Sequence, residues 1–293
     1  MSFVDLHIHS HHSSDGEWSV ERIWREAEKH GMEAFSISDH DTVAGVEEAE
    51  GMREDFSCRL ISNVEISTGY GGHKFHLLAP LVDWRSSSLR DFLSRIRQAR
   101  LRQNRQRVER LRQLGFDLSL KEVEEAMEGR PVTGPAVASA LLKKPQSRRD
   151  PRLRDYFERD GQSGEVAFYK DYFLPGRPAH TPREEAALED AIGLVRRNQG
   201  VAVLAHPGLK PGTVDEEMLT ELKEMGLQGL EVFTSYHDES ASARYLDLAR
   251  KLDLTITAGS DFHGKVKPGV AFGSVREGDL NMVEALEKRR QGN

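Results

Sequence analysis

The most regular feature of the chain is a series of short apolar runs rich in β-branched residues, most of them followed by apolar positions at helical spacing. This alternation predicts strands joined by crossover helices, and therefore an α/β protein with parallel strands. Helix starts are predicted at Thr181 and Thr213, because each is followed by a glutamate three residues later. The predicted strands cover residues 4–8, 34–37, 60–64, 75–79, 201–205, 229–233 and 254–258.

The strand and helix rhythm stops between about residues 85 and 195. Apolar positions between residues 89 and 114 have helical spacing, and the segment 85–112 carries ten arginines against two acidic residues. We therefore expect a mainly helical subdomain over residues 85–195, inserted into a core made of residues 1–84 and 196–293. Its arginines form either an ordinary solvated helix face or a positive rim that attracts polyanionic substrates.

Composition narrows the class of protein. A chain of 293 residues can bury a substantial core, and its net charge of −7 argues against a nucleic-acid coat while leaving room for a local basic surface. Its single cysteine, Cys58, allows neither an internal disulfide nor a cysteine-based zinc site. No apolar run is long enough to cross a membrane. We expect a soluble cytoplasmic protein with no membrane partner, and the sequence leaves its oligomeric state open.

The first predicted strand is polar on one face. In the stretch VDLHIHSHHSSDGEWS, residues 4–19, Asp5, His7 and His9 share one face, while the apolar residues at positions 4, 6 and 8 share the other. Burying three neighbouring ionisable groups is costly unless a partner compensates them, and a bound metal ion would do so. His11 and His12 follow in a loop, where we expect surface positions.

Acidic and imidazole side chains follow nearly every later strand as well. In parallel α/β folds the carboxyl ends of the strands meet at one edge, so these groups are expected to lie together. Imidazole and carboxylate donors without thiolate suit zinc, manganese or iron, and there are more donors than one ion can use. The residues at these strand ends are Asp39, His40, Glu65, His76, His206, Glu231, His237, Asp261 and His263.

This ordered set resembles the polymerase and histidinol phosphatase (PHP) family of metal-dependent phosphoesterases. The resemblance covers about residues 4–80 and 200–275, and it implies a distorted seven-stranded (βα) barrel, TIM-like in architecture, with a trinuclear metal site. The residues that carry it are His7, His9, Asp15, Asp39, His40, Glu65, His76, His206, Asp261 and His263.

Metal ligands can be assigned residue by residue from this resemblance. The first metal would be held by His7, His9, Glu65 and Asp261, and the second by a bridging Glu65 with His76 and His206. The third would be held by Asp15, His40 and His263, although some family members have histidine at the position of Asp15. Asp39 and Glu231 would orient ligands. Three divalent metals are expected, with manganese favoured and iron or zinc as alternatives.

Residues 129–142 and 166–180 of the inserted segment, together with residues 234–264, resemble the branch that includes 3′,5′-nucleoside bisphosphate phosphatases and 5′–3′ exoribonucleases. In that branch the insertion covers the barrel mouth and contacts the substrate. Arg130 and His237 match its motifs, and Lys170 lies in the matching neighbourhood, whereas Val132 stands where the branch usually has histidine. The resemblance implies hydrolysis of the 3′-phosphate of nucleoside 3′,5′-bisphosphates, with the 5′ ends of short RNA as a second substrate class.

For the chemistry we expect a hydroxide that bridges two metals to attack phosphorus, with Asp39, Arg130 and His237 assisting. Arg130, with the third metal, would bind phosphate oxygens, and His237 would bind phosphate or protonate the leaving alkoxide. Three alternatives remain open: a phosphatase acting on histidinol phosphate or another small molecule, a metal-dependent amide hydrolase, and a metal-binding regulatory or proofreading module without turnover of its own.

Overall fold

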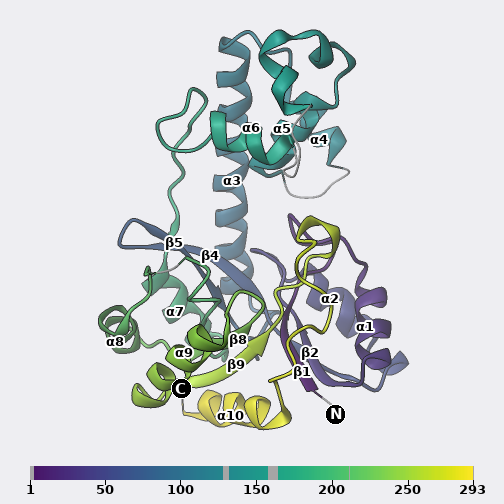
Figure 1. The fold of residues 1–293 in the computed structure, drawn as a ribbon. Coiled ribbons are helices and arrows are strands. Elements are labelled where there is room, and N and C mark those ends of the chain that lie inside the picture. The colour runs from purple at the N-terminus through teal and green to yellow at the C-terminus, as the bar shows by residue number, and fades with distance from the viewer. Residues whose placement is uncertain (1–2, 128–131, 158–163, 211, 293) are drawn as a thin grey trace. The chain divides into compact units, whose positions relative to one another are not determined.

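The computed structural model describes residues 3–127, 132–157, 164–210 and 212–292, which divide into two compact units. The first unit comprises residues 1–94 and 185–293, and the second comprises residues 95–184 (Figure 1). The strands are β1 (Phe3–Ile8), β2 (Met32–Ile37), β3 (Arg59–Ser62), β4 (Glu65–Tyr70), β5 (His73–Leu78), β6 (Ala186–Ala187), β7 (Val203–Leu204), β8 (Gly229–Thr234) and β9 (Thr255–Gly259). The α-helices are α1 (Val20–Lys29), α2 (Ala44–Gly51), α3 (Ser87–Gln113), α4 (Leu120–Ala126), α5 (Gly134–Leu142), α6 (Gly164–Tyr172), α7 (Leu188–Arg197), α8 (Glu216–Glu224), α9 (Glu239–Lys251) and α10 (Leu280–Gln291).

The first unit is a mixed α/β structure built on two sheets. One sheet has the order β1-β2-β3 and is parallel, and the other has the order β6-β4-β5-β7-β8-β9. Helices α1 and α2 pack on the first sheet, whereas α7, α9 and α10 pack on the second (Figure 1). All seven predicted strands are present, and the apolar face of β1 contributes Val4 and Leu6 to a buried cluster that also contains Val283 of α10. The α/β class is therefore confirmed.

The strand directions differ from the prediction at β4 and β5. We expected parallel strands throughout, yet β5 runs antiparallel to both β4 and β7. Gly71 and Gly72, with φ of 55° and 78°, form a two-residue turn that only residues tolerant of positive φ adopt readily, and this turn makes β4 and β5 a hairpin. Glu65 was predicted to end a strand and is instead the first residue of β4.

A continuous seven-stranded barrel is not observed in the described part of the chain, because hydrogen bonding divides the strands into two sheets. Two isolated parallel bridges connect those sheets, one between Ile8 and Phe262 and one between His40 and Glu65. Both bridges lie beside the polar strand ends. The backbone therefore brings the end of β1 against the segment after β9, and the segment after β2 against the start of β4.

The second unit is helical and has its own apolar core. That core includes Leu111 of α3, Val123 of α4 and Phe168 of α6, all fully buried. Arg107 is also buried, with its guanidinium 5.0 Å from the centre of the Phe173 ring and donating to Asn104 Oδ1. Other arginines of α3, among them those at positions 102, 105, 110 and 112, are exposed. Part of the arginine-rich segment is thus a solvated basic helix face.

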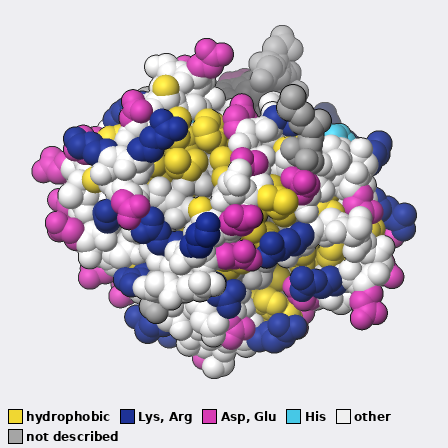
Figure 2. Space-filling view, turned by 90° about the horizontal axis from the view of Figure 1, so that it is seen from below, with side chains coloured by type: hydrophobic (Ala, Val, Ile, Leu, Met, Phe, Trp, Pro, Cys, Tyr) yellow, Lys and Arg dark blue, Asp and Glu magenta, His cyan; other side chains and the backbone are white. Residues whose placement is uncertain are grey.

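The face of the protein shown in Figure 2 carries basic and acidic side chains interspersed, with hydrophobic patches between them. Neither sign of charge forms a continuous field on that face. Among the helices in the described ranges, none combines the length and apolar character that crossing a membrane requires.

Candidate functional site

Four donor atoms converge at the end of β1. The Nε2 atoms of His7 and His9 are 3.1 Å apart, and Asp261 Oδ1 lies 3.2 Å from the first and 3.0 Å from the second. Glu65 Oε2 lies 3.4 Å from His7 Nε2 and 3.2 Å from His9 Nε2. All four side chains are buried. Two imidazoles and two carboxylates from three distant parts of the chain therefore surround one point, in a geometry that could hold a metal ion.

Glu65 connects this group to a second set of imidazoles. Its Oε1 atom lies 2.8 Å from His76 Nδ1 and 3.1 Å from His206 Nε2. Its Oε2 atom, which faces the first group, also lies 2.9 Å from His40 Nδ1. One carboxylate thus presents each of its oxygens to a different set of nitrogens, which is the arrangement that a ligand bridging two ions needs.

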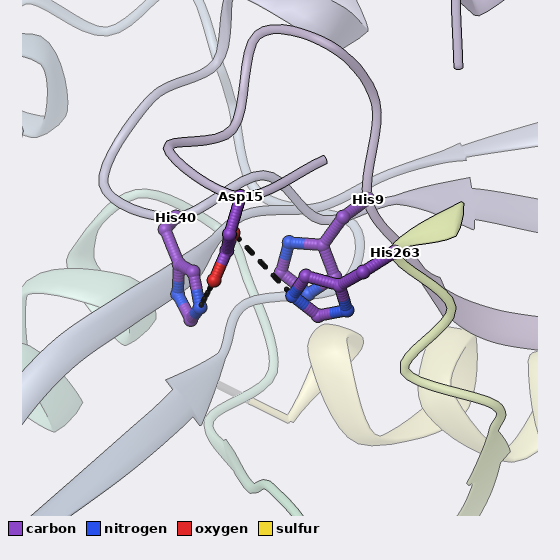
Figure 3. A group of neighbouring side chains, drawn as sticks. All are labelled: His9, Asp15, His40 and His263. Carbon is purple, nitrogen blue, oxygen red and sulfur yellow. Dashed lines mark ion pairs between the residues drawn. The ribbon is translucent and has the colours of Figure 1, made fainter. Parts of the chain in front are cut away.

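A third group surrounds Asp15 (Figure 3). Asp15 Oδ2 lies 3.6 Å from His40 Nε2, and Asp15 Oδ1 lies 3.4 Å from His263 Nε2. His263 Nδ1 donates to the Asp261 carbonyl at 2.7 Å, which turns Nε2 toward Asp15. His9 also belongs to this group, with its ring stacked on that of His263 at 3.8 Å. The structure therefore brings together all nine residues predicted as metal ligands, and it places His9 in two of the groups.

Glu231 of β8 contacts the His7 side chain and the His206 backbone. Its Oε1 atom accepts from His7 Nδ1 at 2.9 Å, and its Oε2 atom accepts from the His206 backbone N–H at 2.8 Å. An acceptor on Nδ1 leaves Nε2 of His7 facing the first group. Gly259 leaves room for Glu231 to contact His7, because a Cβ at position 259 would lie 2.3 Å from His7 Cβ and 2.6 Å from Glu231 Oε1.

Two further buried aspartates support the backbone around the site. Asp39 accepts from Ser10 N at 2.6 Å and from Ser10 Oγ at 2.7 Å, and Asp5 accepts from His7 N at 3.1 Å and Ser260 N at 2.9 Å. Burial raises the pKa of each carboxyl to about 6. Neither aspartate belongs to the three convergent groups. Asp39 thus holds the segment after β1 in place, and Asp5 ties β1 to the segment after β9.

Two of the convergent residues have a backbone conformation unusual for side chains larger than hydrogen. His206 has φ of 27° and Asp261 has φ of 56°, both in the left-handed region. The backbone N–H of Asp261 donates to the His7 carbonyl at 2.8 Å, and that of His206 is held by Glu231. Strain of this kind collects at functional sites where the surroundings over-determine the conformation.

Sequence reasoning missed two residues that hold Asp261. Asp261 Oδ2 accepts from Tyr236 Oη at 2.6 Å and from Lys267 Nζ at 2.7 Å, and Lys267 Nζ also donates to Tyr236 Oη at 2.9 Å. Asp261 Oδ1 is left to face the imidazoles. No motif identifies these two residues, because Tyr236 lies on a different strand end and Lys267 lies in a loop six positions after Asp261.

The electrostatics of the cluster favour cation-binding protonation states at Glu65, Asp261 and His9, whereas His7 favours its protonated form. Burial would raise the pKa of Glu65 and Asp261, but the surrounding imidazoles outweigh it and hold both pKa values well below the usual range. Burial and the neighbouring His263 lower the pKa of His9 to about 4. Burial also acts to lower the pKa of His7, yet the carboxylates around it raise that pKa well above the usual value. Ionised carboxylates with a neutral His9 are the forms that ligate metal ions.

Among the described residues, those predicted for substrate binding and proton transfer are not members of these donor groups. His237 donates from Nδ1 to the Val232 carbonyl at 2.7 Å and accepts at Nε2 from Gly208 N at 2.9 Å, so both ring nitrogens are used within the fold. Burial lowers its pKa. Lys170 is exposed on α6 in the second unit. Arg130 lies outside the described residues.

A pocket of about 220 Å³ opens beside two of the imidazoles in the first unit. It combines apolar walls with two lysines, a lining that suits a phosphorylated organic molecule. Its lining residues are Lys74, Phe75, His76, Ala205, His206, Pro207, Leu209, Lys210 and Thr213.

Comparison with known proteins agrees with this geometry. Residues 5–123 match the PHP domain. A 3′,5′-nucleoside bisphosphate phosphatase of Chromobacterium violaceum is 28% identical over 94% of this chain and 93% of that protein. A phosphoribosyl 1,2-cyclic phosphate 1,2-diphosphodiesterase of Eggerthella lenta is 29% identical over 89% of this chain and 94% of that protein.

A crystal structure from Bifidobacterium adolescentis, provisionally described as a metal-dependent phosphoesterase, superposes with a TM-score of 0.79 at 27% identity, covering 99% of this chain and 96% of that one. The buried clusters of imidazole and carboxylate donors are the chemistry that such an enzyme requires. Residues 5–123 therefore resemble the PHP domain, and the chain is a metal-dependent phosphoester hydrolase.

Proposed function

We propose that this enzyme removes the 3′-phosphate of nucleoside 3′,5′-bisphosphates, and that the 5′ ends of short RNA are its second substrate class. The observation that carries the phosphoesterase chemistry is Glu65, whose two oxygens face two different sets of imidazoles. The substrate class is supported by the similarity to a bisphosphate phosphatase over nearly the whole of both chains.

The donors fit divalent metal ions. Glu65 Oε2 and Asp261 Oδ1 are buried and accept no hydrogen bond from the described residues, yet ring nitrogens lie 2.9 to 3.4 Å from them. Three ions would be held by the sets around His7 and His9, around His76 and His206, and around Asp15, with manganese favoured. Bound there, such ions would lower the pKa of a water molecule to give a nucleophile and would neutralise charge on the phosphoryl oxygens.

The residues of the chain itself position and attract the substrate. Glu231 keeps Nε2 of His7 directed at the first group, and Lys267 with Tyr236 keeps Oδ1 of Asp261 directed there. Lys210 places positive charge on the pocket beside His76, and Lys74 also lines it while pairing with Glu185 at 2.7 Å. The inserted helical subdomain, expected over residues 85–195, would supply further positive surface through its exposed arginines.

The metal part of the proposal is tested by two substitutions in the first group. We expect His7→Ala and Asp261→Ala to lose phosphate release and bound metal together, because each removes a donor from a buried site. Elemental analysis of the purified variants and a phosphate-release assay measure the two effects. His73→Ala changes an exposed histidine at the start of β5 and serves as the matched control, for which no loss is expected. A fully active His7→Ala protein would contradict the scheme.

The substrate part is tested by a panel. It contains 3′-phosphoadenosine 5′-phosphate, ordinary mononucleotides, 5′-phosphorylated oligoribonucleotides, a cyclic ribose phosphate and histidinol phosphate. We expect the highest kcat/KM for the bisphosphate, with release of the 3′-phosphate. A preference for histidinol phosphate would assign a small-molecule phosphatase instead. Metal binding with no turnover on any member would favour a regulatory or proofreading module.

A further inference from the structure

A second group of metal-ligand type lies outside the cluster described above. His11 and His12, in the loop after β1, and Glu48, on α2, place one donor atom each within 4.8 Å of one another. His12 Nε2 lies 2.5 Å from Glu48 Oε2, and His11 Nε2 lies 3.8 Å from the same oxygen. The two imidazole rings are 4.2 Å apart. From sequence, both histidines were expected to be ordinary surface residues.

The distances suit an ion. Ligand atoms of one tetrahedral zinc ion, at bond lengths of about 2.0–2.1 Å, lie roughly 3.4 Å apart. The distance from His12 Nε2 to Glu48 Oε2 is shorter than this, and the distance from His11 Nε2 to the same oxygen is longer. Each distance would have to change by less than about 1 Å to suit a bound ion. The contacts in the central cluster lie at or slightly below the same separation, at 3.0 to 3.4 Å.

The surroundings determine what kind of ion and how firmly it would bind. The three side chains are 29% to 39% exposed, so an ion can enter from solvent and keep water as a further ligand. Two imidazoles with one carboxylate favour zinc over manganese, because affinity at nitrogen-rich sites rises toward the end of the first transition series. His11 Nδ1 has no hydrogen-bond partner among the described residues, so no acceptor fixes its ring as Glu231 fixes His7. Binding should therefore be exchangeable.

We propose that His11, His12 and Glu48 form a separate, exchangeable zinc site on the outer side of the loop that carries Asp15. An ion there would tie this loop to α2. The loop is already linked to the central site, since Ser13 Oγ lies 3.2 Å from His9 Nδ1 and donates to Asp15 Oδ1 at 2.8 Å. The site is thus placed to stiffen the segment that presents Asp15, and it goes beyond the proposed hydrolysis because it needs no substrate.

The test counts zinc ions in the full chain. Wild-type protein, His12→Ala and Glu48→Gln are dialysed against buffered zinc and analysed for bound metal. We expect each variant to hold about one ion fewer per chain than wild type, and to gain less thermal stability from added zinc. The matched control is His30→Ala, because His30 has a glutamate partner, Glu26, at 3.6 Å and belongs to no three-donor group in the described structure.

A repeat in the Asp261→Ala background keeps this proposal separate from the catalytic one. The double variant Asp261→Ala with His12→Ala should still hold about one zinc ion fewer than Asp261→Ala alone, even though the central site is damaged in both. Equal zinc content in wild type, His12→Ala and Glu48→Gln would overturn the proposal and leave His12 and Glu48 as a hydrogen-bonded pair. The same loss in His30→Ala would also overturn it, because the effect would then be nonspecific.

Discussion

Lys267 Nζ lies 2.7 Å from Asp261 Oδ2, while Asp261 Oδ1 lies 3.0 Å from His9 Nε2. The two oxygens of one carboxylate thus have different partners, a lysine on one side and the convergent imidazoles on the other. Asp261 is 1% exposed, so its charge depends on these partners for compensation. Lys267 supplies that compensation whether or not a metal ion is bound.

Replacing Lys267 by methionine should therefore lower the free energy of unfolding more in the metal-free protein than in the metal-bound protein. Removing one partner of a largely buried pair leaves a charge uncompensated, and for this partly exposed lysine we expect a loss of about 1–3 kcal/mol in the free energy of unfolding. Added metal would restore the compensation, so the gain in stability on adding manganese should be larger in Lys267→Met than in wild type. Denaturant unfolding with chelator and with metal measures both. Lys265→Met, an exposed lysine two residues earlier, should behave as wild type.

Glu231→Gln should weaken metal binding without removing a ligand. Both oxygens of Glu231 accept a hydrogen bond, one from His7 Nδ1 and one from His206 N. The side chain of glutamine has a single oxygen, so it can keep one of these bonds, and its NH2 group cannot accept the second. We expect metal affinity to fall about 10- to 100-fold, the usual effect of losing a group that orients a ligand. Competition with a chelator of known affinity measures this change. Unchanged affinity would show that Glu231 does not orient His7.

His237→Phe separates a positioning role from a proton-transfer role. Phenylalanine keeps a ring that can stack on Tyr245, as His237 does at 4.9 Å, and it loses both hydrogen bonds to the backbone. We expect a loss of about 1–3 kcal/mol in unfolding free energy from the unpaired Val232 and Gly208 groups. The pH profile of kcat should keep its shape. Loss of its basic limb would instead support His237 as the general acid that the sequence predicts.

The exposed arginines of α3 should affect substrate capture rather than chemistry. For Arg102→Glu combined with Arg105→Glu we expect a several-fold rise in KM for a nucleotide bisphosphate with little change in kcat, because these charges attract a polyanion from a distance. Screening by salt should shrink the difference between wild type and variant. Arg25→Glu combined with Lys29→Glu, at two exposed positions of α1, makes the same change in net charge and is the control. Equal KM values at low salt would leave the helix face as ordinary solvated surface.

Cys58 should react only when the protein opens. Burial and the nearby Glu28 raise the pKa of its thiol to about 12, and the side chain is buried at the edge of β3. We expect reaction with an aromatic disulfide reagent to be slow at pH 8 and to rise with pH beyond 9, because the thiolate is the reactive form. As the single cysteine of the chain, it makes the reaction rate in rising denaturant a direct measure of unfolding. Rapid labelling of the native protein would contradict its burial.

Much of the site was predictable because it depends on local pattern. Alternation along β1 places His7 and His9 on one face whatever surrounds the strand, and strand ends in an α/β fold gather at shared edges. For that reason the nine predicted donors, from His7 to His263, do lie together. Their identity as metal ligands stays a prediction until metal content is measured.

Other features depended on contacts between distant segments. Thr181 was predicted to start a helix, and that prediction is wrong: Thr181 is buried, its carbonyl accepts from Gln103 Nε2 at 2.7 Å, and the next helix, α7, begins only at Leu188. The helix start predicted at Thr213 is displaced to Asp215, whose side chain accepts from Met218 N at 2.9 Å. A capping pattern shows where a helix can begin by local preference, whereas tertiary packing decides where the helix does begin.

The sequence by itself determined which side chains could form a metal site, since composition and spacing decide donor type and the face of a strand. Only the tertiary structure decided how those donors share carboxylates and what holds them. Glu65 faces two groups because β4 and β5 form a hairpin, and Asp261 is divided between Lys267 and the imidazoles because a loop folds back on β9. The grouping of His11 and His12 with Glu48 likewise required α2 to pack beside the first loop, which no local pattern encodes.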